Sequence, residues 1–99
     1  MKVKLENKLQ NYMNENGHKD LVVYVTACNT WGGPVKNVSA RFAEGNEELL
    51  LNMGYETLTT ELGQLYYHPN QVIMTDSPQL SLGKFLWMPV IRMRGIRAA

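Results

Sequence analysis

The chain has 99 residues and a formal net charge of +1, which predicts one domain with no overall attraction to nucleic acid or to membrane surfaces. It contains a single cysteine, so an internal disulfide is excluded, and a reducing, cytoplasmic location is the simplest expectation. The charged N-terminus is unlike a signal peptide, and no apolar run approaches the roughly 20 residues of a membrane-spanning helix.

An amphipathic helix is predicted over residues 3–16. Leu5, Leu9, Tyr12 and Met13 recur at the spacing of one helical face, which favours packing against a core. Gly17 is suited to end the helix in a left-handed conformation, and His18 follows in the exit loop.

Two strands are predicted next, joined by a turn. Residues 21–26 are β-branched and aromatic, and residues 35–42 alternate between apolar and polar positions. The alternation predicts that Val38, Ala40 and Phe42 face the core. Residues 28–34 are expected to form the turn, with Pro34 stopping strand pairing locally and Cys28 at the mouth of the loop.

The second half of the chain reads as a short helical or irregular segment followed by several short strands. The acidic residues 44–54 are expected to lie over the sheet, with a mobile loop as the other interpretation. A turn or bulge is predicted at Gly63, a second turn at residues 75–78, and a broken or edge strand near Pro89. Residues 55–62 and 64–68 are rich in threonine and tyrosine, which are good strand formers, and the remaining short segments are apolar or alternate between apolar and polar residues: 72–74, 80–82, 85–88 and 90–96.

These elements predict a single domain over residues 1–99, of the α+β class and mainly β. In this prediction the N-terminal helix packs on a mixed or antiparallel sheet of short strands. No internal repeat, linker or low-complexity segment interrupts the chain.

The layout resembles the HesB/IscA-type domain of A-type iron–sulfur carriers. The resemblance rests on the N-terminal helix, on the hairpin of residues 23–42 that contains Cys28, and on the Gly-x-Leu-Tyr-Tyr-x-Pro segment of residues 63–69. It implies a HesB-like fold, a homodimer, and an iron ion or iron–sulfur cluster held through Cys28. The cysteine pair that the family carries near its C-terminus is absent here, so co-ligands would have to come from His18, His68, Asp76, a second copy or an external thiol.

A second hypothesis is a non-enzymatic interaction or adaptor module that has kept the fold and lost the metal site. Trp31, Gly32 and Gly33 would then contact a protein partner, because an exposed tryptophan marks a contact surface. The competing expectation for Trp31 is that it folds back over the edge of the core, and Trp87 is predicted to be a core residue.

Catalysis is not expected. Cys28 is interpreted either as a ligand or reactive thiol, or as a small buried apolar residue at a strand end. A cysteine-dependent enzyme would need His18 or His68 beside the thiol. Arg92, Arg94 and Arg97 form a basic edge, in which Arg92 and Arg94 share one face of a predicted strand. Such residues guard a sheet edge, so nucleic acid is not expected as a partner.

Overall fold

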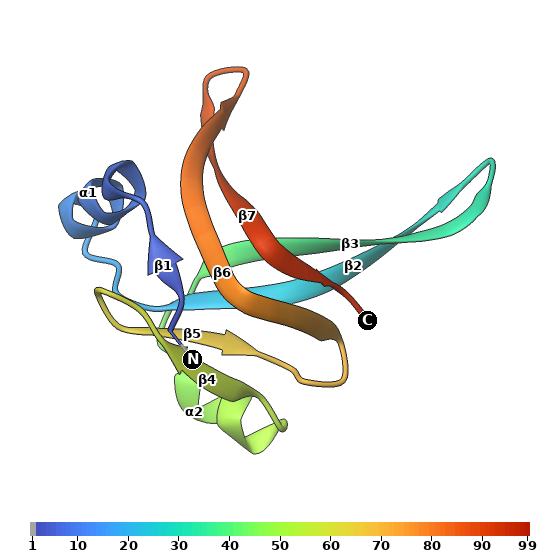
Figure 1. Ribbon diagram of the computed structural model, residues 1–99, viewed down its shortest axis with the longest axis horizontal. Helices are drawn as coiled ribbons and strands as arrows, with labels where there is room; N and C mark the ends of the chain where they lie inside the picture. The colour runs from blue at the N-terminus through green and yellow to red at the C-terminus, as the bar shows by residue number, and fades with distance from the viewer. Residues whose placement is uncertain (1) are drawn as a thin grey trace.

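The structure of the protein, a computed structural model, describes residues 2–99 and places two mixed sheets around one core (Figure 1). The α+β, mainly β prediction is confirmed, and its single sheet is corrected to two. In chain order the elements are β1 (Lys4–Leu5), α1 (Asn7–Glu15), β2 (Leu21–Thr30), β3 (Gly33–Phe42), α2 (Glu47–Asn52), β4 (Glu56–Thr59), β5 (Gln64–Tyr67), β6 (Val72–Phe85) and β7 (Met88–Ala98).

The first sheet has the strand order β3-β2-β5-β4, and the second has the order β1-β6-β7. In each sheet one pair is parallel, β2 with β5 and β1 with β6, and the other pairs are antiparallel. The strands β2, β3, β6 and β7 have 10 to 14 residues, so the prediction of short strands is wrong for these four.

Helix α1 covers the core with the predicted apolar stripe, in which Leu9 and Met13 are fully buried. The helix starts at Asn7 rather than residue 3, because Lys4 and Leu5 pair with β6 instead. Leu21, Leu65 and Leu80 meet this stripe from three different strands and are also fully buried. The alternation predicted for β3 is confirmed, since its apolar residues Val38, Ala40 and Phe42 pack against this core.

Helix α2 confirms the expectation of a short helical segment over the first sheet. Its Leu50 is buried in a small cluster with Val22 and Tyr66. Burial raises the pKa of Tyr66, and the nearby carboxylates of Asp20 and Glu47 raise that pKa further.

The prediction of a turn at residues 75–78 is wrong, because β6 runs through this segment as one strand. The pairing of β6 with β7 shifts between Met74 and Gln79, and Gly95 of β7 has φ +75° at this irregularity. Residues 75–78 of β6 lie opposite Gly95 alone, so the ladder is interrupted here, and this bulge admits the buried Pro78, whose missing N–H would interrupt a regular ladder.

The bulge also exchanges the two faces of β7. Before Gly95 the odd-numbered residues, such as Met93, pack against the core; after it, Ile96 does. Arg94 and Arg97 are therefore both exposed on the outer face, although their numbers differ by three.

Candidate functional site

The β2–β3 hairpin extends beyond the body of the protein (Figure 1). Strand β2 pairs with β5 only at Leu21 and Val22, whereas it pairs with β3 along its full length. We call residues 26–37 the arm; apart from Gly33, which is half-buried, all of these residues are exposed. An isolated two-stranded ribbon is marginally stable in water and leaves backbone groups unpaired along its edges.

The arm places Cys28, Trp31, Gly32 and Gly33 close together near its end. The strand continues through Cys28, which lies opposite Val35, so Cys28 is within a strand and not at the mouth of a loop. Pro34 pairs with Asn29 inside β3, contrary to its predicted role as a strand breaker; an edge strand accepts proline because its N–H is not needed. Trp31 and Gly32 form the turn, which the Thr30 hydroxyl closes by donating to the carbonyl oxygen of Gly33 at 2.8 Å.

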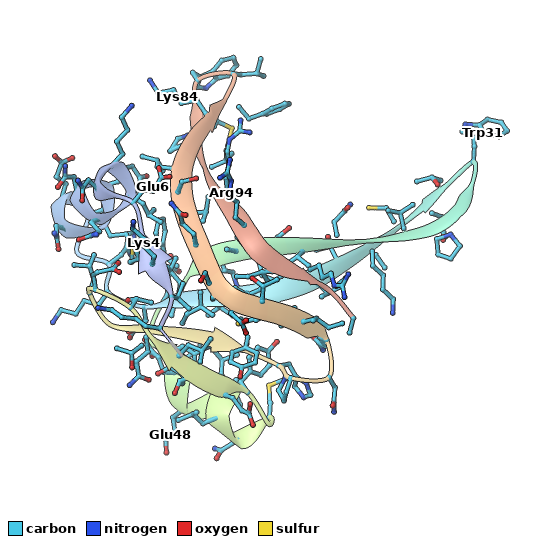
Figure 2. All side chains as sticks on the ribbon, viewed as in Figure 1. Lys4, Glu6, Trp31, Glu48, Lys84 and Arg94 are labelled. Atoms are coloured by element: carbon cyan, nitrogen blue, oxygen red, sulfur yellow. The ribbon has the colours of Figure 1, made fainter. Side chains whose placement is uncertain are left out.

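Trp31 stands free at the end of the arm, pointing away from the body (Figure 2). Its exposed fraction is 108%, so the expectation that it folds back over the core is wrong. Trp31 is exposed because β2 and β3 are long enough to place the turn between them beyond the core residues. Cys28 is also exposed, which rules out its interpretation as a buried apolar residue.

A second exposed apolar tip lies at the β6–β7 hairpin. We call residues 85–88 the β6–β7 tip; Phe85 is 67% exposed, Leu86 72%, Trp87 82% and Met88 57%. The prediction that Trp87 is a core residue is wrong, because Phe85 pairs with Met88 and leaves Leu86 and Trp87 as a two-residue turn. Pro89 lies in β7 at the edge of its sheet, as expected.

The turn of the β6–β7 tip is strained. Leu86 has φ +58° and is the only residue other than glycine with positive φ in residues 2–99. Two-residue hairpin turns favour glycine or asparagine at such positions, and a leucine there costs on the order of 1–2 kcal/mol. Strain of this kind gathers at functional sites, where a side chain is retained despite its backbone cost.

The donors needed for a resident metal do not gather around Cys28. Within residues 2–99, no group of three or more His, Cys, Asp or Glu side chains could hold a metal ion. His18 stacks on Phe42 with ring centroids 4.1 Å apart, and Nδ1 of His68 accepts a hydrogen bond from the N–H of Asn70. A cluster that takes four protein ligands therefore does not fit the side chains of one copy.

The chain matches no protein-family model, and no curated protein is similar to it in sequence. The resemblance to the HesB/IscA-type domain stays a prediction. Neither α1 nor α2, the helices of residues 2–99, has the length and apolar character of a membrane-spanning helix.

Proposed function

We propose that the protein is a non-enzymatic interaction module whose contact surfaces are the two apolar hairpin tips, and that they bind a second copy of the chain. The observation that carries this proposal is the exposure of large apolar side chains at both tips. Trp31 is at one tip, and Phe85, Leu86, Trp87 and Met88 form the other. Exposed tryptophans in an apolar patch are characteristic of contact surfaces.

A second copy is favoured because each chain carries two different tips. A twofold dimer in which the arm of each copy contacts the β6–β7 tip of the other covers all four tips with one repeated contact. The contact would also support the arm, whose long edges have no neighbouring strand. The strained backbone at Leu86 is consistent with this role, because the cost of the positive φ is accepted where a leucine side chain is needed at the contact.

The apolar surface is large enough for such a dimer. Complete burial of one large apolar side chain is worth about 1.5–3 kcal/mol. Phe85, Leu86 and Met88 are between 57% and 72% exposed, so covering them contributes about 3–6 kcal/mol, and covering the larger Trp87, which is 82% exposed, contributes about 3–5 kcal/mol. Twofold symmetry doubles this contribution, which is then at least comparable to the roughly 4–15 kcal/mol lost in translational and rotational freedom on association.

Iron or cluster binding through Cys28 makes a different prediction about the dimer. A shared metal would bring the two Cys28 thiolates together, whereas exchanged arms would bring each Cys28 close to the other copy's β6–β7 tip. The two hypotheses therefore predict different intermolecular disulfides. Anaerobic reconstitution with iron and sulfide tests the metal directly, through an absorption band that the Cys28→Ser variant would lose.

Disulfide trapping tests the exchanged-arm dimer. The Met88→Cys variant adds one thiol to the β6–β7 tip, and Leu49→Cys adds one to α2, where Leu49 is 59% exposed. Helix α2 lies away from both hairpin tips (Figure 1). Under oxidised glutathione we expect the Met88→Cys variant to form an intermolecular disulfide with Cys28 faster than Leu49→Cys or the wild type does. Equal rates in the three proteins would contradict the proposal. Fast linkage between two Cys28 residues in the wild type would favour the shared-metal arrangement instead.

A further inference from the structure

A basic groove lies where β7 passes β3. Its volume is about 810 Å³, and its charged lining consists of four basic residues and a single acidic one, Glu6. The carboxylate of Glu6 already accepts a hydrogen bond from the side-chain amide of Gln79 at 2.9 Å. The basic residues are Lys36, Arg92, Arg94 and Arg97.

The fold assembles this groove from residues that are dispersed in the sequence. Arg92 and Arg94 share the outer face of β7, and the bulge at Gly95 adds Arg97 to the same face. Lys36 reaches the groove from β3, which packs beside β7. Most of the acidic residues lie elsewhere, such as Glu48 on α2, at a distance from Arg94 (Figure 2). A chain of almost neutral net charge therefore presents one strongly positive surface.

The groove continues into a second hollow that contains aromatic residues. The two hollows share Val38 and Ile91, and the second has a volume of about 530 Å³. Tyr24 lines it, with the guanidinium carbon of Arg41 6.0 Å from the ring centroid. Phe42 and one acidic residue, Glu44, also line this hollow.

We infer that this double hollow binds single-stranded nucleic acid. Arginine forks match phosphate oxygens in bidentate geometry, and the amide and hydroxyl side chains of Gln79 and Ser81 belong to the set that contacts phosphate and sugar. A positively charged groove beside an aromatic platform is the combination that single-strand binders use. No residue of α1 or α2 lines either hollow, so no helix is placed to enter the major groove of a duplex.

This inference does not depend on the hairpin tips, and it revises the expectation that nucleic acid is not a partner. The expectation was based on a basic edge of Arg92, Arg94 and Arg97, with only Arg92 and Arg94 on one face and no aromatic residue nearby. In the structure Arg97 lines the same groove as these two arginines, Lys36 joins them from β3, and Tyr24 lines the adjoining hollow.

Fluorescence anisotropy with a labelled oligomer of about twelve thymidines tests the inference, because the site size of small single-strand binders lies in this range. With three arginine–phosphate contacts, binding should weaken about 20-fold between about 50 and 200 mM salt. Arg94→Ser should lower the affinity and reduce this loss to about 7-fold. Tyr24→Leu should lower the affinity about 5-fold or more through lost base stacking. Lys19→Ser is the matched control, because Lys19 is exposed and lines neither hollow.

Arg94 is exposed, so its substitution should leave the melting temperature unchanged, which separates a binding defect from misfolding. Three results would overturn the inference. One is the absence of oligonucleotide binding at the lower salt concentration. The second is equal losses in Arg94→Ser and Lys19→Ser. The third is tighter binding of a duplex of the same length, or of polyglutamate, than of the single strand.

Discussion

Replacing Trp87 by serine should separate association of the protein from its folding. Trp87 lies in the turn of the β6–β7 hairpin and is 82% exposed, so its indole contributes little to the core of the monomer. Exposed substitutions of this kind change the free energy of unfolding by no more than about 0.5 kcal/mol. Leu80→Ala is the opposite case, because Leu80 is fully buried and its truncation should cost about 2–5 kcal/mol of unfolding free energy.

The effect of Trp87→Ser on the dimer follows from the same exposed fraction. A tryptophan buries about 150–250 Å² when it is covered, so the 82% that is exposed in the monomer corresponds to about 120–200 Å². At about 25 cal/mol per Å² this area is worth about 3–5 kcal/mol. The substitution should therefore raise the dissociation constant of the dimer by at least about 100-fold.

Dilution calorimetry for association and urea unfolding for stability measure the two quantities. Leu49→Ser is the control, because Leu49 is 59% exposed on α2 and lies outside both tips. Association should be lost in Trp87→Ser and kept in Leu49→Ser. Urea unfolding is followed at a concentration where the proteins are monomeric, because dimerisation itself stabilises the folded state, and there the free energy of unfolding should change little in either variant. A dimer of unchanged affinity in Trp87→Ser would refute the assignment of the β6–β7 tip as a contact surface.

Two further predictions concern glycine geometry and turn strain. Gly95→Ala should lower the free energy of unfolding by about 1–3 kcal/mol, because its φ is +75° and a Cβ there would overlap the Thr75 hydroxyl and come within 3.2 Å of Pro78 Cα. Gly45→Ala has a similar φ of +81° but open space around the Cβ, so urea unfolding should give it a smaller loss, and equal losses would contradict the role of the overlap. Leu86→Gly should raise the free energy of unfolding by up to about 1 kcal/mol, because it relieves the positive φ, and should weaken the dimer. A decrease of stability in Leu86→Gly, measured in the same way, would show that the leucine is not strained.

Local sequence pattern predicted the parts of the fold that depend on periodicity. The apolar stripe of α1, the inward face of β3 and the turn at Gly63 between β4 and β5 are found where the alternation and spacing placed them. The spacing of apolar residues along the sequence indicates which residues are buried, because one face of each helix or strand packs on the core.

The sites of exposure could not be predicted in this way, because they depend on the lengths of neighbouring strands. Trp31 is exposed because β5 supports only the first two residues of β2, and nothing in residues 21–42 encodes the length of β5. Trp87 is exposed because the hairpin turns at a Leu-Trp pair, which carries none of the usual turn residues. The basic groove was missed because the bulge at Gly95 changes the face of Arg97.

The sedimentation-equilibrium mass of the wild-type protein tests the central claim most directly, provided that it is measured at low and high concentration with and without a reducing agent. The proposed dimer predicts a mass that rises from 11.3 kDa to twice that value as concentration increases, independently of the reducing agent. A mass that stays at 11.3 kDa at every concentration would contradict the proposal that the two hairpin tips bind a second copy.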